Sequence, residues 1–140
     1  ILPGVETYIA DAKRLNVKLA VASNSDRNWV TGHLERLGLI HHFNVVRCWN
    51  DPDVGQRKPQ PAVYDATLAA LGISAVEAIA LEDSFNGILS ATRAGMFTVA
   101  VPNTLTKTIG VGVADIELES MVHMPLEELL RLAEQRRSQN

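Results

Sequence analysis

Residues 78–88 read Ala-Ile-Ala-Leu-Glu-Asp-Ser-Phe-Asn-Gly-Ile, an apolar run that ends in two adjacent carboxylates. This order predicts a strand over 78–81, followed by a helix over 86–94 that ends before Gly95. Two carboxylates at the tip of an apolar strand are costly unless a cation or a lysine compensates them. Carboxylate oxygens suit Mg²⁺, which keeps several waters and also binds substrate phosphate. Capping of the helix by Asp83 or Ser84 is the alternative, and it is compatible with metal binding.

Strand and helix alternate in the same way along the rest of the sequence. Helices are predicted over 5–15, 28–37, 62–71 and 86–94, and from Pro125 onward with Leu126, Leu129, Leu130 and Ala133 on one face. Strands are predicted over 17–22, 43–49, 78–81 and 98–101, with a weaker one over 115–118. Strands separated by helices favour a Rossmann-like α/β fold, a parallel sheet with helices on both faces. Because ligands of such sheets bind beyond the carboxyl ends of the strands, the polar strand ends are the candidates for chemistry.

Two further strand ends carry candidate residues. Ser23, Asn24 and Ser25 follow one predicted strand, and a hydroxyl beside the N–H groups of a helix start suits a phosphate oxygen. Helix capping by Ser25 or Asp26 is the alternative. Lys58 lies in a turn before a proline and can present its ammonium to a phosphoryl group or a carboxylate nucleophile, whereas simple solvation is its alternative. Hydroxyl, lysine and acid pair together indicate a Mg²⁺-dependent phosphoryl-transfer site.

In combination these residues resemble the motifs of the haloacid dehalogenase superfamily, in its phosphatase and β-phosphoglucomutase-like branch. The resemblance covers nearly the whole chain. Leu2-Pro3-Gly4-Val5 resembles the segment that follows the family's helical cap. Ser23 matches the second motif, Lys58 the third, and residues 82–88 with Ala94-Gly95-Met96 the fourth. The fourth stretch is the most specific. One departure is Arg57, which stands where the family often has glycine before the lysine.

The resemblance implies a role for each matching residue. Ser23 and the backbone N–H of Asn24 would bind the phosphoryl oxygens. Lys58 would share in that binding and act in catalysis, by neutralising charge on the phosphoryl group and on the nucleophile. Asp83, supported by Glu82, would hold Mg²⁺ directly or through water. Two supporting residues of the same loop, Ser84 and Asn86, would keep it ordered.

The resemblance also implies an Asp-x-Asp pair, a nucleophile and a general acid/base, after an apolar strand that precedes the cap. The sequence starts after both, so residues 1–140 are expected to form a single partial core domain without that strand and cap, inactive as given. Asp51-Pro52-Asp53 has the same spacing but no long apolar run before it, and is interpreted as loop. The missing strand is expected between those that end at Ser23 and Glu82, where a gap leaves two edges unpaired. A fragment is the favoured explanation. Closure of the gap by the neighbouring strands and a strand supplied by a partner chain are the alternatives.

Composition narrows the function classes. Hydrophobic residues make up 46% and charged residues 21% of the sequence, as in ordinary soluble globular proteins. A formal net charge of −3 gives no electrostatic reason to expect nucleic-acid binding, and no apolar stretch is long enough to cross a membrane. The single cysteine, Cys48, lies in an apolar run that predicts burial, and a reducing cytoplasm is the expected location.

Two functions therefore stay open at this point. The favoured one is a Mg²⁺-dependent phosphatase or phosphomutase of a small phosphorylated metabolite. The alternative is a degenerate, non-catalytic domain that binds a phosphorylated ligand or a protein partner. A response-regulator-like or nucleotide-binding domain would share the sheet but fits the position of the acid pair poorly. Dehalogenation is less favoured because Glu82 and Asp83 suit a metal.

Overall fold

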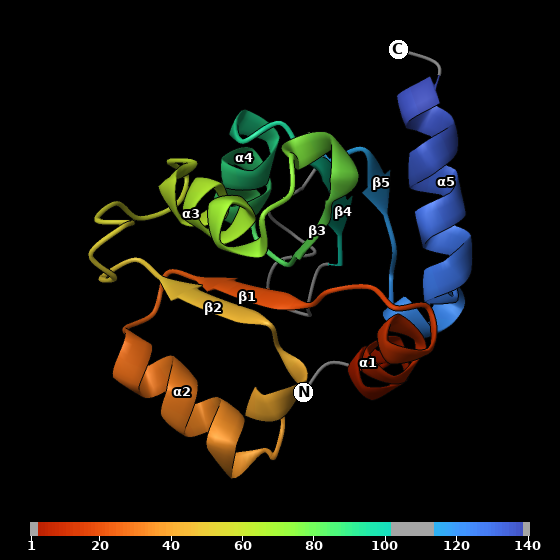
Figure 1. Ribbon diagram of the computed structural model, residues 1–140. Coiled ribbons are helices and arrows are strands. Elements are labelled where there is room, and N and C mark those ends of the chain that lie inside the picture. The colour runs from red at the N-terminus through yellow and green to blue at the C-terminus, as the bar shows by residue number, and fades with distance from the viewer. Residues whose placement is uncertain (1–2, 102–113, 139–140) are drawn as a thin grey trace.

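The computed structural model describes residues 3–101 and 114–138, in which helices and strands alternate as predicted (Figure 1). The α-helices are α1 (Val5–Arg14), α2 (Arg27–Arg36), α3 (Ala62–Leu71), α4 (Phe85–Arg93) and α5 (Leu126–Ser138). The strands are β1 (Ala20–Ser23), β2 (Val45–Cys48), β3 (Ile79–Glu82), β4 (Phe97–Ala100) and β5 (Ile116–Glu117). Short 3₁₀ helices lie at Ile40–His42, Ala75–Glu77 and Met121–His123. The fourth strand is predicted to end at Val101, and the residues that follow it, Pro102 and Asn103, lie outside the described residues.

All the strand pairs within the described residues are parallel, which confirms the predicted fold class. β1 pairs with β2, while β4 pairs with β3 on one side and with β5 on the other. These pairs form two separate ladders, β1-β2 and β3-β4-β5. In the part of the chain that the structure describes, β1 and β3 share no ladder, and this is the place where the sequence predicts a missing strand.

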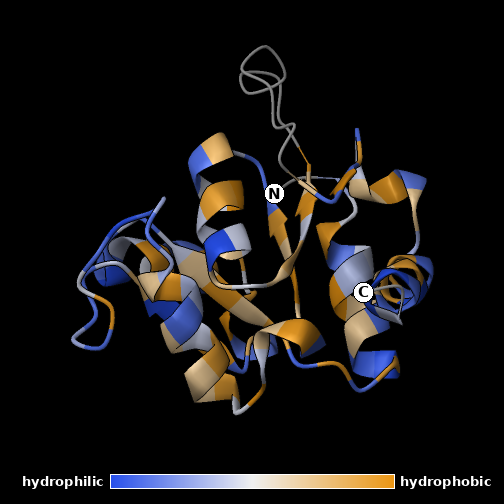
Figure 2. Cartoon of the chain, turned by 90° about the horizontal axis from the view of Figure 1, so that it is seen from above, coloured by the Kyte–Doolittle hydropathy of each residue, from blue (hydrophilic) through white to orange (hydrophobic). Residues whose placement is uncertain are grey.

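Helices cover both faces of the two ladders (Figure 1). α2 and α3 lie on opposite sides of β1 and β2, and α4 and α5 on opposite sides of β3, β4 and β5. The alternation along β4 shows why, because successive side chains of a strand point to opposite faces. Val99 packs in a core cluster with Leu129 of α5, whereas its neighbour Ala100 packs against Ile88 of α4. Figure 2 shows the strands coloured mainly as hydrophobic, in keeping with burial on both faces.

α5 presents the apolar face that its spacing predicts. Leu126, Leu129 and Ala133 are buried, and α1 meets this helix through a core cluster that includes Tyr8. The Tyr8 hydroxyl donates a hydrogen bond of 2.6 Å to the carbonyl of Met124, just before α5 begins. Within residues 3–101 and 114–138, no helix combines the length and the apolar character that crossing a bilayer requires.

The first two strands are shorter than predicted. The sequence predicts strands over 17–22 and 43–49, but the ladder covers only Ala20–Ser23 and Val45–Cys48. Asn44 is the reason, because its Oδ1 accepts a hydrogen bond of 2.9 Å from the Leu19 backbone N–H. The Asn44 backbone N–H in turn donates to the Leu19 carbonyl at 2.7 Å. A side-chain acceptor therefore replaces the next rung of the ladder.

A partly buried ion pair holds the loop after β2. Arg27 Nε donates to Asp51 Oδ1 at 2.6 Å, and Asp51 Oδ2 also accepts a bond of 2.9 Å from the Cys48 backbone N–H. Asp51 is buried, and its hydrogen bond with the Arg27 guanidinium holds its pKa below the usual value. Cys48 is buried as predicted, and this burial raises the pKa of its thiol. Asp51 thus serves loop structure, as its sequence setting indicates.

Acid is expected to weaken this ion pair. The pKa of Asp51 is lower in the folded chain than its usual 3.8, so its stabilisation is present above that value and is lost as pH falls through the folded pKa. Asp51→Asn is expected to cost about 1–2 kcal/mol at pH 7, less than for fully buried pairs because the Arg27 side chain is 39% exposed. Urea unfolding of the parent chain and of Asp51→Asn should show this difference in the free energy of unfolding at pH 7 and a smaller difference at pH 3. An equal difference at both pH values would contradict the prediction.

Candidate functional site

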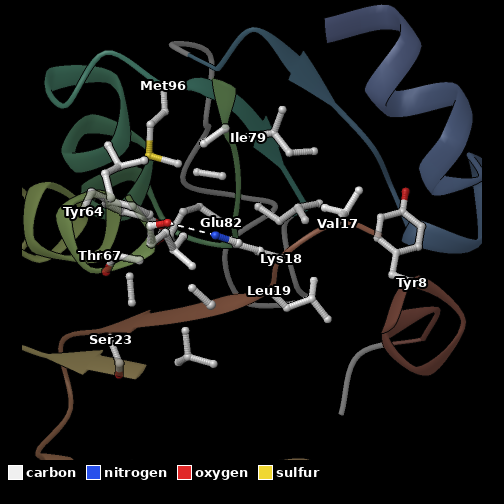
Figure 3. A pocket seen from close by; sticks show the side chains of 18 of the residues that line it. Tyr8, Val17, Lys18, Leu19, Ser23, Tyr64, Thr67, Ile79, Glu82 and Met96 are labelled. Atoms are coloured by element: carbon white, nitrogen blue, oxygen red, sulfur yellow. Dashed lines mark hydrogen bonds between the residues drawn. The ribbon is translucent and has the colours of Figure 1, made fainter. Parts of the chain in front are cut away.

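A groove of about 900 Å³ runs along β1 and β3 and includes the carboxyl ends of both strands (Figure 3). Residues of α3 line it, as do residues of α1 and α5, and most of the lining side chains are apolar. Almost all of the predicted site residues belong to this lining, namely Ser23, Asn24, Lys58, Glu82, Asp83 and Ser84. Asn86 lies outside it. The structure therefore gathers the three predicted strand ends at one place.

Lys58 connects the two ladders at this place. Its ammonium donates a hydrogen bond of 2.9 Å to the carbonyl of Ala22 in β1 and a second one to Glu82 Oε1 at the end of β3. The Lys58 side chain is only 9% exposed, so the simple solvation weighed above is not what the structure shows. An ammonium held by two fixed acceptors is pre-oriented, and this is the condition under which a charge is effective in a site.

Glu82 is enclosed on three sides. Its Oε1 accepts hydrogen bonds from the Lys58 ammonium and from the hydroxyl of Tyr64 in α3. Its Oε2 lies against Gly87 of α4, so closely that a Cβ at that position would overlap the carboxylate. Glu82 is itself buried. Its charge is thus compensated by a lysine, one of the two compensations that the sequence suggests for the acid pair.

Tyr64 is a site residue that the sequence reasoning missed. It lies in an apolar helix pattern six positions after Lys58, where a tyrosine resembles ordinary core packing. In the structure it lines the groove beside Glu82 (Figure 3) and its ring centroid lies 5.2 Å from the Lys58 ammonium. Burial, together with the neighbouring Glu82 carboxylate, raises the pKa of Tyr64 well above its usual value. The phenol is therefore a permanent donor at neutral pH.

The side chain of Ser23 takes part in the turn that follows β1. Ser23 Oγ accepts a hydrogen bond of 3.0 Å from the Ser25 backbone N–H, which folds the turn locally. Helix capping by a Ser25 or Asp26 side chain is not found, because Asp26 occupies the position before α2 without a capping bond. Its Oδ1 instead accepts a bond of 3.0 Å from Trp49 Nε1.

The loop that carries Lys58 is tied to that turn. The Lys58 backbone N–H donates to Asn24 Oδ1 at 2.7 Å, so the Asn24 side chain anchors the loop. Arg57, the departure from the family pattern, has its guanidinium 4.2 Å from the centroid of the Trp49 ring. Trp49 in turn bonds Asp26, as described above. The extra bulk of Arg57 is thus accommodated by stacking on the loop.

The predicted site residues after Glu82 differ in their surroundings, since one caps a helix and two are exposed. Ser84 caps α4, since its Oγ accepts a bond of 3.1 Å from the Gly87 backbone N–H. Asp83 is exposed and lines the groove, whereas Asn86 is exposed on the first turn of α4. Of the two interpretations of this stretch, capping is found at Ser84, whereas metal binding at the exposed Asp83 stays a prediction.

The donor chemistry at this edge fits Mg²⁺ in part. Within the described ranges, no group of three or more His, Cys, Asp or Glu side chains converges as in a complete metal centre. Asp83 and Glu82 offer oxygen donors, but Glu82 Oε1 is engaged by Lys58 and Tyr64. Mg²⁺ commonly uses one or two carboxylates and fills its other positions with water and substrate phosphate. Asp83, which is exposed and lines the groove, would hold the ion, with Glu82 in support.

Comparison with known sequences gives a match over most of the chain. Residues 1–101 match the family model described as haloacid dehalogenase-like hydrolase. The putative phosphatase YhcW of Bacillus subtilis is 45% identical over 128 residues, which cover 91% of this chain and 57% of YhcW. Hexitol phosphatase B of Escherichia coli is 29% identical over 131 residues, which cover 93% of this chain and 58% of that protein. The chain thus spans little more than half the length of these relatives.

Solved structures show the same relation. CbbY from Rhodobacter sphaeroides, in complex with xylulose-(1,5)bisphosphate, is 32% identical with a TM-score of 0.79, covering 86% of this chain and 54% of that one. The β-phosphoglucomutase of Clostridium difficile gives a TM-score of 0.85 at 24% identity, covering 99% of this chain and 58% of that one. At that identity the second likeness concerns the fold alone.

Proposed function

This chain belongs to the haloacid dehalogenase-like hydrolases, and from this membership we propose that it forms part of a Mg²⁺-dependent phosphohydrolase of a small phosphorylated metabolite. The observation that carries the proposal is that Ser23, Lys58 and Asp83 line one groove, and that Lys58 is hydrogen-bonded to Ala22 and Glu82, the residues just before the other two. A hydroxyl, a buried ammonium and an accessible carboxylate at one edge suit a phosphoryl group and its metal ion. A reducing compartment such as the cytoplasm is part of the same proposal, since Cys48 is buried and free.

Each side chain has a distinct task in this proposal. The Ser23 hydroxyl and the Asn24 backbone N–H bind phosphoryl oxygens. Lys58 already donates to two protein acceptors, and the remaining one of its three N–H groups is offered to the phosphoryl group. Its positive charge offsets the negative charge that gathers there during transfer. Asp83 holds Mg²⁺, and the ion, when bound, supplies further charge neutralisation on the phosphoryl oxygens.

The groove itself supports a second element of the proposal, a further strand between β1 and β3. Both strands pair on only one side within the described residues, and the space between them is lined by apolar side chains of each. A parallel strand inserted there would pair both edges, and its carboxyl end would lie beside Lys58. In the proposal this strand carries the nucleophilic carboxylate. In the proposal it comes from polypeptide that precedes these residues in a longer protein, and a strand from a partner chain is the alternative.

The non-catalytic alternative makes a different prediction. A degenerate domain would bind a phosphorylated ligand, or a protein partner, without turnover. Ligand binding alone would raise the melting temperature in the presence of Mg²⁺ and inorganic phosphate. The phosphatase names of the relatives favour the enzyme, and the burial of Lys58 against Glu82 favours a site whose charge is already oriented.

Asp83→Asn is the variant that tests the proposed enzyme. In a form extended upstream of Ile1 by the strand and cap, phosphate release from sugar phosphates is expected to require Mg²⁺. Asp83→Asn should lower kcat/KM by at least about 100-fold, because a neutral amide holds Mg²⁺ poorly. Residues 1–140 alone should show no turnover, since no nucleophile is supplied.

Asp65→Asn is the matched control, because Asp65 is an exposed aspartate of α3 outside the groove lining. It should leave the rate unchanged. Full activity in Asp83→Asn would remove Asp83 from the site. Absence of phosphate release from the extended form, with a melting shift retained, would favour the non-catalytic domain.

A further inference from the structure

We propose that Tyr64 is the positioning residue of Lys58 and fixes the ammonium in two ways, through its hydroxyl on Glu82 and directly through its ring. The inference deepens the proposed function, because it concerns the lysine that would face the phosphoryl group. Nothing in the sequence pattern points to this role, and neither the relatives' names nor the fold assigns it. It rests on the contacts of one buried phenol.

The first contact is indirect and runs through a shared acceptor. Glu82 Oε1 accepts from both the Tyr64 hydroxyl and the Lys58 ammonium. A carboxylate on a strand end can rotate about its side-chain bonds, and each rotation would move the ammonium that follows it. Tyr64 holds the shared oxygen from α3, while Gly87 of α4 leaves just enough room for the second oxygen. Glu82 is therefore clamped between two helices, and Lys58 binds an acceptor that cannot turn away.

The second contact is direct. The Lys58 ammonium lies 5.2 Å from the centroid of the Tyr64 ring, within the range of a cation–π interaction. Together with the carbonyl of Ala22 at 2.9 Å, the ring and the carboxylate surround the ammonium from three elements, α3, β1 and β3. Tyr64 is 6% exposed, so water does not compete for its hydroxyl. The same residue thus fixes both partners of the ion pair.

The two contacts can be separated by substitution and measured through the chemistry of Lys58 itself. Tyr64→Phe keeps the ring and removes the hydroxyl, whereas Tyr64→Leu removes both. Acetic anhydride acylates the neutral amine and releases acetate, so at a fixed pH the rate at Lys58, followed residue by residue with mass spectrometry, reports how often this side chain leaves its acceptors, loses its proton and meets the reagent. The exposed Lys13 in the same chain is the internal reference. Tyr64→Phe is expected to raise the Lys58 rate about fivefold relative to Lys13, the fold-change of one ordinary hydrogen bond, and Tyr64→Leu to raise it further.

Thr67→Val is the matched control for simple loosening of α3. Thr67 is also buried and lines the groove, but its hydroxyl donates within the helix, to the carbonyl of Val63 at 2.6 Å. It should lower stability while leaving the Lys58 rate unchanged. Equal rates in Tyr64→Phe and the parent chain, or an equal rise in Thr67→Val, would overturn the proposal.

A second measurement separates this inference from the proposed function. Titration of the parent chain with inorganic phosphate in the presence of Mg²⁺, followed by NMR, tests whether Lys58 faces a phosphoryl group. Tyr64→Phe should weaken that binding about fivefold, and the effect should vanish in a Lys58→Met background. No binding by the parent chain would count against the proposed function alone, since the acylation rates decide the role of Tyr64 without any phosphate.

Discussion

Glu82→Ala is expected to destabilise the chain by about 3–5 kcal/mol. The substitution removes the acceptor that Lys58 and Tyr64 share, and both donors lie in surroundings that exclude most water, with the Lys58 side chain 9% exposed. The large value comes from the uncompensated ammonium, because removing one partner of a buried pair costs more than the pair itself contributes. Urea unfolding at pH 7 measures the loss.

Glu128→Ala is the control, since Glu128 is an exposed glutamate of α5 and its replacement should change stability by no more than about 0.5 kcal/mol. The stability lost in Glu82→Gln should lie between the losses in Glu82→Ala and Glu128→Ala, because an amide oxygen can still accept a hydrogen bond but carries no charge. A loss in Glu82→Ala as small as in Glu128→Ala would show that Lys58 reaches water when its partner is removed. The ion pair would then be peripheral to the fold.

Gly87→Ala is the second substitution with a large expected effect, a loss of about 2–4 kcal/mol from a single added methyl group. Alanine normally stabilises a helix relative to glycine, so the sign here is decided by the surroundings. A Cβ at position 87 would overlap the Glu82 carboxylate, and the carboxylate cannot move without leaving Lys58 and Tyr64. The cost therefore combines overpacking with a broken buried pair.

Gly32→Ala is the control, and its expected effect on stability is opposite to that of Gly87→Ala. Gly32 lies inside α2, and a Cβ built there has no atom outside that helix's own backbone within 4 Å. This substitution should stabilise the chain by about 0.5–1 kcal/mol. Thermal unfolding of the two variants side by side should move the melting temperature in opposite directions. A stabilised Gly87→Ala protein would mean that Glu82 has room to shift, against the clamp inferred from its contacts.

The fold could be predicted from the sequence because its signals are local. Apolar runs that end in polar clusters located the cores of the strands, and the spacing of Leu126, Leu129 and Ala133 located the buried face of α5. The limits of the strands were predicted less accurately, because a strand ends where its partner strand stops pairing with it. Asn44, which bonds Leu19 through its side chain, stops the first ladder early and leaves no trace in the apolar pattern.

The sequence predicted most of the residues that meet at the groove, but not the contacts that each of them makes there. Glu82 was expected to support Asp83 at the metal, yet neighbouring residues at a strand end point to opposite sides, and Glu82 is buried whereas Asp83 is exposed. Tyr64 was missed for a different reason. The partner of its hydroxyl is eighteen residues away in sequence, and this pairing arises only when α3 packs beside β3. Tertiary contacts of this kind have no local signal.

The separation of the two ladders bears on the order in which the chain acquires its structure. β1, α2 and β2 are consecutive in sequence, and so are β3, α4 and β4, so each ladder closes its first pair through short-range contacts. Such units open and close with their own free energies, which differ between parts of one protein. Lys58 joins them by hydrogen bonds to Ala22 in one and Glu82 in the other, beside an apolar cluster that also includes Ala22 and Ala80. These contacts make the two neighbouring folding units depend on each other, and a strand in the groove would merge them into one cooperative sheet.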